Sequence, residues 1–235
     1  MQLFYNSSIT EKDKSFVFDK EESKHIIKVL RKKEGDILFV TNGLGCVFKT
    51  EIALASDSKC TITILSFEKQ ELPKYRLHLA VAPTKMNERY EWFLEKATEI
   101  GIQEITPIIC EHSERKIIKI DRFQKIIESA MKQSLHFFIP KLNEPITYKE
   151  FLKKEFNGQK FIAHCEETDK KSLKSVAKME RDILIIIGPE GDFSVKEIQM
   201  ALDNKFIAVS LGNTRLRTET AAIVACHSVN FLNEI

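Results

Sequence analysis

At 235 residues, of which 43% are hydrophobic and 30% charged, the chain is long enough to bury a core in one large domain or two smaller ones. A net charge of +2 is too small to indicate a nucleic-acid partner by itself, so charge has to be considered locally. Five scattered cysteines without a C-x-x-C pair, no apolar run of membrane-spanning length and no signal peptide predict a cytoplasmic protein without a disulfide framework or a zinc site.

Residues 1–70 contain the short β-branched and aromatic runs that are typical of a β-rich domain. Asn42-Gly43 is a tight-turn signal and predicts a hairpin between residues 36–41 and 46–54. A short helix lies before this hairpin, and we expect Gly35 to close it. The pattern predicts a small barrel-like β domain that carries one helix.

That helix has five cations and no acid between Lys24 and Lys33. Lys24, Lys28 and Arg31 follow the spacing i, i+4, i+7 and therefore share one helix face. The apolar residues expected to be buried behind that face are Ile26, Ile27, Val29 and Leu30. A cationic face without acidic partners predicts contacts to phosphates, and an ordinary solvated surface is the alternative.

A charged segment containing Pro73 ends this domain, and strands and helices then alternate from residue 75 to 232. We expect strands at 77–81, 105–109, 161–163, 183–187 and 206–209. We expect helices at 86–100, 121–133, 148–156, 169–179, 194–202 and 218–232. Ser194 and Glu197 predict a capping box, and Thr218 is the expected N-cap of the last helix. The alternation predicts a mostly parallel sheet with helices on both faces over residues 71–235.

Two glycine-bearing loops follow apolar strands of this second domain. Gly188-Pro189-Glu190-Gly191 follows the most apolar strand, and Leu211-Gly212-Asn213-Thr214-Arg215-Leu216-Arg217 follows the strand at 206–209. Open α/β sheets bind ligands beyond the carboxyl ends of their strands. Apolar side chains beside a few polar groups are typical of a small-molecule pocket.

Standard nucleotide and hydrolase motifs are absent from the sequence. It contains no Walker loop, no G-x-G-x-x-G after the first strand of the α/β region, no H-E-x-x-H and no G-x-S-x-G.

A purely structural alternative exists for each of the two glycine-bearing loops. The first could be a plain strand-to-helix turn, and the second could be fixed by an ion pair between Arg217 and Glu219.

The loop sequences IGPEGDFS and SLGNTRLRTETAA together resemble the C-terminal signature of RsmE-type 16S rRNA (uracil-N3) methyltransferases of the SPOUT superfamily. HIIKVLRKKEGD resembles the basic helix of that family's PUA-like RNA-binding domain. Lys85 with EKATEIG resembles the start of its methyltransferase domain, and Gln133-Ser134 with Pro140 resembles its middle segment. The sequence departs from the family at His136, where a basic residue is common, and at Asp192, where glycine is common.

The resemblance implies a PUA-like β-barrel domain over residues 1–70 and a SPOUT methyltransferase domain with a deep trefoil knot over residues 71–235. It implies a homodimer that uses S-adenosylmethionine, needs no metal, and methylates N3 of a uridine in 16S rRNA of the 30S subunit. The alternatives are a SPOUT enzyme that acts on tRNA and a catalytically silent RNA-binding protein.

The resemblance also implies roles for individual residues. The adenine of the cofactor would lie among the backbone segments 163–166, 188–191 and 211–216. The residues expected to contact it are His164, Gly188, Glu190, Gly191, Leu211, Gly212, Asn213, Leu216 and Arg217. We expect Arg217 to stabilise negative charge on the uracil, and Glu190 to accept its N3 proton, contact a ribose, or simply fix the loop. The residues expected to contact RNA are Lys24, Lys28, Arg31, Lys85 and Arg89.

Overall fold

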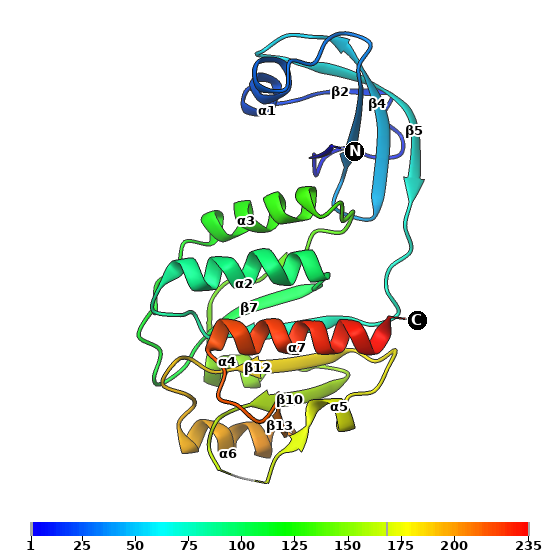
Figure 1. Ribbon diagram of the computed structural model, residues 1–235. Coiled ribbons are helices and arrows are strands. Elements are labelled where there is room, and N and C mark those ends of the chain that lie inside the picture. The colour runs from blue at the N-terminus through cyan, green and yellow to red at the C-terminus, as the bar shows by residue number, and fades with distance from the viewer. Residues whose placement is uncertain (1, 168, 235) are drawn as a thin grey trace. The chain divides into compact units, whose positions relative to one another are not determined.

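The computed structural model describes residues 2–167 and 169–234. The chain divides into two compact units (Figure 1). The N-terminal unit consists of residues 1–72 together with 131–139, and the C-terminal unit consists of residues 73–130 and 140–235. The N-terminal unit is therefore discontinuous in sequence, since a short segment from the middle of the chain belongs to it. None of the described helices is long and apolar enough to cross a membrane.

A five-stranded sheet forms the N-terminal unit. Its strands, in spatial order, are β1 (Leu3–Tyr5), β3 (Ile37–Thr41), β4 (Cys46–Leu54), β5 (Thr61–Lys69) and β2 (Ser15–Val17). β1 and β3 are parallel, and every other neighbouring pair is antiparallel. The predicted hairpin is confirmed, with Gly43 at a φ of 73° in its turn. Closure of this sheet into a barrel stays a prediction.

The helix of this unit consists of an α-helical turn, α1 (Lys20–Lys24), followed by a π-helical turn, η1 (His25–Val29). We expected it to end at Gly35, but it ends at Val29, with Leu30 as its C-cap and Arg31 directly after it. Arg31 has a φ of 54°, in the left-handed region, and the following N–H of Lys32 donates to the carbonyl of Ile26 at 3.1 Å. A left-handed residue of this kind closes the last turn of a helix, so the chain is turned away four residues before the glycine.

The π-helical turn changes which side chains face solvent. Val29 was expected to be buried but is 67% exposed, because a π-turn holds more residues than an α-turn and rotates the following positions around the axis. The expectation of a face without acidic partners is also wrong, because Lys28 lies beside Asp57, with 3.3 Å between Nζ and Oδ2. Lys24 and Arg31 are exposed.

The helix is held to the sheet by a buried serine and an apolar core. The Ser23 hydroxyl donates to the carbonyl of Phe18 at 3.1 Å and accepts from the N–H of Cys60 at 2.9 Å. The core around it consists of Phe4, Phe18, Ile26, Leu38, Val40, Ile52, Cys60 and Ile62. The buried side of the helix is thereby fixed, while its cations remain at the surface.

A parallel sheet forms the centre of the C-terminal unit, as the sequence predicted. Its strands, in spatial order, are β11 (Lys171–Ser172), β13 (Ile207–Ser210), β10 (Gln159–Ala163), β12 (Ile183–Ile187), β6 (Leu77–Val81), β7 (Glu104–Ile109) and β8 (Lys141–Leu142), with β9 (Ile146–Thr147) also paired to β7. All of these pairings are parallel. β12 is buried along its whole length, as an inner strand covered on both faces must be.

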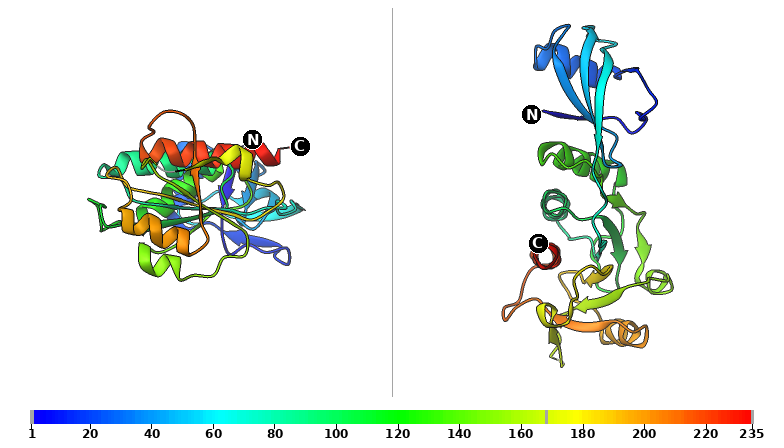
Figure 2. Two further views of the ribbon diagram at one scale, coloured as in Figure 1. Left: turned by 90° about the horizontal axis from the view of Figure 1, so that it is seen from below. Right: turned by 90° about the vertical axis from the view of Figure 1, so that its right-hand side faces the viewer.

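Helices cover both faces of this sheet (Figure 2). They are α2 (Asn87–Ile100), α3 (Ile120–Gln133), α4 (Tyr148–Leu152), α5 (Leu173–Val176), α6 (Val195–Asp203) and α7 (Thr218–Asn233). α7 packs on α2, β6 and β12, whereas α4 packs on α6 and β7. The view from below in Figure 2 shows α7 (red) and α6 (orange) on opposite faces.

Two predicted helices are shorter in the structure and one predicted cap is wrong. The helix expected over 169–179 is confined to α5, because Lys171 and Ser172 pair with β13. The helix expected over 148–156 ends at Leu152. Arg217, not Thr218, is the N-cap of α7. The capping box of Ser194 and Glu197 is confirmed.

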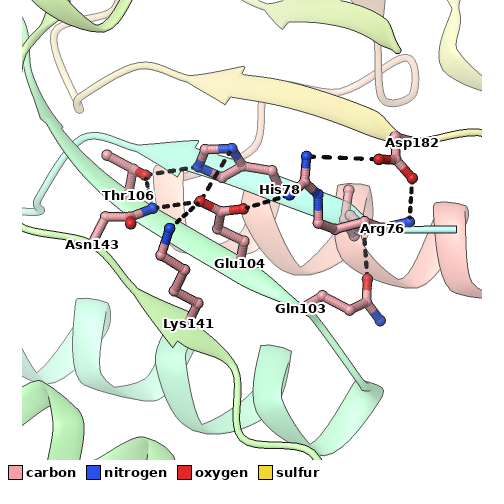
Figure 3. A network of polar contacts seen from close by, with 9 residues as sticks. Arg76, His78, Gln103, Glu104, Thr106, Lys141, Asn143 and Asp182 are labelled. Atoms are coloured by element: carbon pink, nitrogen blue, oxygen red, sulfur yellow. Dashed lines mark hydrogen bonds and ion pairs between the residues drawn. The ribbon is translucent and has the colours of Figure 1, made fainter. Parts of the chain in front are cut away.

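A polar network lies at the amino ends of β6, β7 and β8 (Figure 3). Asn143 Nδ2 donates to Glu104 Oε1 and to the Thr106 hydroxyl, each at 2.8 Å. The Thr106 hydroxyl lies 2.7 Å from His78 Nε2 and can donate to it. The cations around Glu104 are Arg76 and Lys141. The network joins three neighbouring strands at their amino ends, away from the carboxyl ends of the sheet.

Candidate functional site

The carboxyl ends of β10, β12 and β13 meet at a cavity with a volume of about 560 Å³. Its lining comes from residues 163–165, 187–190 and 209–218, with a few side chains from nearby positions. β10 lies between β12 and β13. Because the three strands are parallel neighbours, the segments that follow them converge at the carboxyl ends of the sheet. The cavity is therefore a direct consequence of the strand order.

All but one of the residues expected to contact a cofactor line this cavity. They are His164, Gly188, Glu190, Leu211, Gly212, Asn213, Leu216 and Arg217. The remaining residue, Gly191, lies next to the lining residue Glu190. Two of these positions favour glycine over a residue with a side chain. Gly212 has a φ of 147°, which other residues rarely adopt, and a Cβ at Gly188 would lie only 3.0 Å from the Phe193 ring.

His164 is a buried polar side chain of the cavity wall. It follows β10, is 7% exposed, and neither ring nitrogen has a hydrogen-bond partner in the described part of the chain. Burial, followed by the charge of Lys170, lowers the pKa of His164. The imidazole is therefore neutral at pH 7 and presents one donor and one acceptor. Because buried polar groups are normally hydrogen-bonded, these nitrogens suit a polar ligand in the cavity.

Glu190 is fixed by a backbone group from another loop. The N–H of Lys85 donates to Glu190 Oε1 at 2.9 Å. This is the loop-fixing hydrogen bond that the sequence left open as one role for Glu190, and it leaves the side chain at the cavity wall. Lys85 itself is not a lining residue. Its ammonium pairs with Glu114 at 2.9 Å, and this hydrogen bond raises the pKa of Lys85.

Two contacts set the position of the second loop at the start of α7. The Thr218 hydroxyl donates to the carbonyl of Gly188 at 3.0 Å and thereby joins the two loops. Glu219 is 7% exposed, and its Oε1 lies 3.8 Å from Arg89 Nε, so Arg89 is the cation beside it. Arg217 precedes both residues, is exposed, and lines the cavity.

Asp192, where the sequence departs from the family pattern, ties two cavity segments together. Its φ of 62° lies in the left-handed region, which glycine adopts freely and aspartate tolerates better than most residues. Its Oδ2 accepts from the N–H of Cys165 at 2.7 Å. The side chain thus adds a bond between the segments after β10 and β12 that glycine cannot make.

Two side chains next to the site were missed in the sequence. Arg115 donates to the carbonyls of Thr84 and Lys85, and His112 lies 3.1 Å from the carbonyls of Gly191 and Asp192. Both come from the segment after β7, which matches none of the motifs considered. A basic residue and a histidine in a loop carry no local signal of such distant contacts.

The residues expected to contact RNA fall into two groups. Lys85 and Arg89 lie in the C-terminal unit, next to Glu190 and Glu219 respectively. Lys24, Lys28 and Arg31 lie in the N-terminal unit. Within residues 2–167 and 169–234, no group of three or more His, Cys, Asp or Glu side chains could hold a metal ion.

Comparison with known proteins gives matches along nearly the whole chain. A family model described as the RNA methyltransferase domain matches residues 70–230, and one described as the RNA methyltransferase PUA domain matches residues 18–65. The ribosomal RNA small subunit methyltransferase E of Buchnera aphidicola (subsp. Acyrthosiphon pisum) is 35% identical over 222 residues, which cover 89% of this chain and 85% of that protein.

Solved structures of similar proteins match the chain over nearly its whole length as well. A probable rRNA-methyltransferase from Porphyromonas gingivalis is 39% identical, has a TM-score of 0.92, and the match covers 99% of this chain and 98% of that one. A ribosomal RNA small subunit methyltransferase E from Neisseria gonorrhoeae, bound to S-adenosyl methionine, is 25% identical with a TM-score of 0.87 and coverage of 99% and 98%. The chain therefore belongs to the ribosomal RNA small subunit methyltransferase E family of RNA methyltransferases.

Proposed function

We propose that this protein transfers the methyl group of S-adenosylmethionine to N3 of a uridine in 16S rRNA of the small ribosomal subunit. The observation that carries the proposal is the cavity where the segments after β10, β12 and β13 converge. The similar enzyme from Neisseria gonorrhoeae was solved with S-adenosyl methionine bound. Family membership supports the RNA substrate, and the N3 position rests on the resemblance of the two loop sequences.

The cavity residues fit this cofactor. A volume of about 560 Å³ is in the range of small-molecule sites. Leu211 and Leu216 supply apolar surface, while the segments at Gly188 and Gly212 bring backbone donors and acceptors to the wall. His164 adds the donor and acceptor of a neutral imidazole. When bound, S-adenosylmethionine supplies an electrophilic methyl group on a positively charged sulfur.

The polar side chains at the cavity mouth suit the chemistry of a uracil ring. Removal of the N3 proton places negative charge on the two flanking carbonyl oxygens, and the fork of Arg217 would stabilise that charge. Glu190 binds the Lys85 N–H through Oε1, so Oε2 is the oxygen that would accept the N3 proton or a ribose hydroxyl. Both residues would act by holding a positioned base beside the cofactor.

Residues 1–70 would supply RNA affinity, and residues 71–235 would supply methyl transfer. Lys24, Lys28 and Arg31 would contact phosphates, which fix position without reading sequence. Lys85 and Arg89 would contact RNA beside the cavity. The target uridine must be turned out of the folded RNA to reach the cofactor. We place the reaction in the cytoplasm, on the 30S subunit.

The chain path supports a deep trefoil knot in the C-terminal third of the chain. β13 lies beside β10 on the side away from β12, yet the following segment 211–217 leads to α7, which packs on β6 and β12. The chain must therefore return past β10 and β12. An experimental structure in which segment 211–217 does not pass through another loop would contradict the knot.

A homodimer is the assembly we propose. Trp92 on α2 is 44% exposed and Phe231 on α7 is 67% exposed, and large apolar side chains at the surface of packed helices suit burial by a second copy. Light scattering at micromolar concentration tests this proposal, and a mass equal to one chain would contradict it.

The decisive experiment maps the methyl group by mass spectrometry after incubation with 30S subunits, naked 16S rRNA or tRNA. We expect N3-methyluridine at one position of the small-subunit rRNA. Arg217→Ala should lower the rate at saturating cofactor by about 100-fold, the loss typical of one charge-stabilising donor. Arg181→Ala, an exposed arginine outside the site, is the control. Methylation of tRNA alone, or a full rate in Arg217→Ala, would refute the respective assignment.

A further inference from the structure

The segment Glu111–Arg115, which follows β7, contacts the loops on both sides of Glu190. The backbone at the start of this segment is itself held by hydrogen bonds. The Cys110 N–H donates to the Ser113 hydroxyl at 2.9 Å, and Ser113 is 4% exposed. The Glu111 N–H donates at 2.9 Å to Glu197 Oε1, while Oε2 of the same carboxylate accepts from the Ser194 N–H in the capping box of α6. The side chains of this segment therefore start from a fixed backbone.

Arg115 binds the loop that follows β6 through a fork of hydrogen bonds. Its Nε lies 3.2 Å from the carbonyl oxygen of Thr84 and 3.1 Å from that of Lys85, and its Nη2 donates to Lys85 at 2.6 Å. The neighbouring Glu114 binds the Lys85 ammonium at 2.9 Å. Two consecutive residues of the segment thus hold the backbone and the side chain of Lys85.

The carbonyl of Thr84 and the N–H of Lys85 belong to the same planar peptide group. A bond that fixes the carbonyl therefore also fixes the direction of the N–H. That N–H donates to Glu190 Oε1 at 2.9 Å. The guanidinium also polarises the peptide group and strengthens its N–H as a donor. Arg115 is in this way connected to Glu190 without touching it.

The same segment holds the chain on the other side of Glu190. His112 Nδ1 lies 3.1 Å from the carbonyl oxygens of both Gly191 and Asp192 and can donate to them. A Cβ at Gly191 would come within 3.1 Å of the His112 Cβ, so this contact requires glycine or a shift. The segment Glu111–Arg115 therefore holds the chain on both sides of Glu190, through Arg115 on one side and His112 on the other.

We propose that Arg115 is a positioning residue for the cofactor site: through the Thr84–Lys85 peptide it holds Glu190 at the cavity wall. The proposal rests on the proposed function and extends it to a residue that neither lines the cavity nor belongs to the loop motifs. The arrangement pre-organises the Pro189–Gly191 loop before the cofactor arrives, which lowers the ordering cost of binding.

Cofactor affinity of Arg115 variants, measured by calorimetry with S-adenosylmethionine, tests the proposal. Arg115→Ala should raise the dissociation constant about tenfold, the loss expected for hydrogen bonds from a charged donor. Arg115→Lys keeps the charge but lacks the planar fork, so it should restore little affinity for S-adenosylmethionine. Arg122→Ala is the matched control, since Arg122 is exposed and pairs with Glu91. Recovery of wild-type affinity in Arg115→Lys would overturn the positioning role.

A double-mutant cycle with Glu190→Ala tests whether Arg115 acts through Glu190. Strong coupling is expected, so that the double variant binds S-adenosylmethionine no more than about twofold worse than the weaker-binding single variant. Independent effects that multiply would overturn the proposal, as would wild-type affinity in Arg115→Ala. If Arg115→Ala does not fold, Arg115→Lys serves in the same cycle. A wild-type protein that does not bind S-adenosylmethionine would instead refute the proposed function, and this inference with it.

Discussion

At the scale of single residues, the left-handed backbone at Arg31 and Asp192 shows two ways in which strain is accommodated. An L-residue in this region costs about 1–2 kcal/mol. Asp192, with a φ of 62°, recovers part of that cost through its bond to the Cys165 N–H. Arg31, with a φ of 54°, closes a helix where glycine would be more favourable. An arginine at this position therefore costs stability that a glycine would keep.

Arg31→Gly should therefore stabilise the protein while weakening RNA binding. Relief of the backbone strain, less the extra chain entropy of glycine, should raise the free energy of unfolding by about 0.5–1 kcal/mol. Arg31→Ala is the control because it removes the same guanidinium but keeps the strain. Urea unfolding of both variants provides the measurement. Equal or lower stability of the glycine variant relative to the alanine variant would show that the conformation carries no strain.

The site residues that could be predicted are those with a local signal. Gly188, Gly212 and the apolar Leu211 and Leu216 stand in two short loops after strands, and the structure places them around one cavity. Arg115 could not be found in this way. Its partners Thr84 and Lys85 lie about thirty residues away in sequence, and the contact exists only because β6 and β7 are neighbours in the sheet.

At the scale of elements, strand and helix periodicity predicted most of the C-terminal unit, whereas tertiary pairing overrode it in places. The helical pattern of 169–179 was interrupted because Lys171 and Ser172 pair with β13. The π-turn of η1 could not be predicted, because apolar spacing in so short a segment does not distinguish it from an α-turn. These errors arise where a few residues are governed by neighbours distant in sequence.

The network at the amino ends of β6, β7 and β8 makes stability depend on pH through His78. Burial, reinforced by the nearby cations Arg76 and Lys141 and opposed by Glu104, lowers the pKa of His78 to about 4 from its ordinary 6.5. The unfolded chain therefore binds more protons between these values. The stabilisation is complete above pH 6.5 and is lost as the pH falls toward 4, by at most about 3 kcal/mol.

His78→Gln should flatten this dependence. Urea unfolding between pH 7.5 and 4.5 should give a smaller loss of stability in the variant than in the wild-type protein. The depressed pKa of Glu104 contributes mainly below its ordinary 4.5, outside this range. His227→Gln, at an exposed position of α7, is the matched control and should keep the wild-type slope. Identical slopes in all three proteins would show that His78 does not titrate on unfolding.

At the scale of the whole molecule, the N-terminal unit contains the cationic helix and the C-terminal unit contains the cavity. The two-part organisation was predicted from the change in pattern near Pro73, and the parallel sheet from the alternation after it. The inclusion of residues 131–139 in the N-terminal unit and the position of β10 between β12 and β13 could not be predicted from local patterns. Both result from packing between segments that are far apart in sequence.

This organisation predicts that RNA affinity and cofactor affinity can be changed separately. Lys24 and Arg31 are exposed and form no ion pair within the described part of the chain, whereas Lys28 already has Asp57 as a partner. If Lys24 and Arg31 each neutralise a phosphate, replacing both by alanine should reduce the salt dependence of RNA binding. The slope of log affinity against log salt should fall by about 0.7–0.9 per lost contact.

The matched control is Lys12→Ala with Lys14→Ala, which removes the same charge from another exposed part of the N-terminal unit. RNA binding measured from low to high salt should show a reduced slope only in the Lys24/Arg31 variant. The affinity of both variants for S-adenosylmethionine should stay within about twofold of wild type, because none of these residues lines the cavity. Equal slopes in the two variants would mean that the helix acts only through net charge, since a phosphate contact depends on where the cation stands and not on the total.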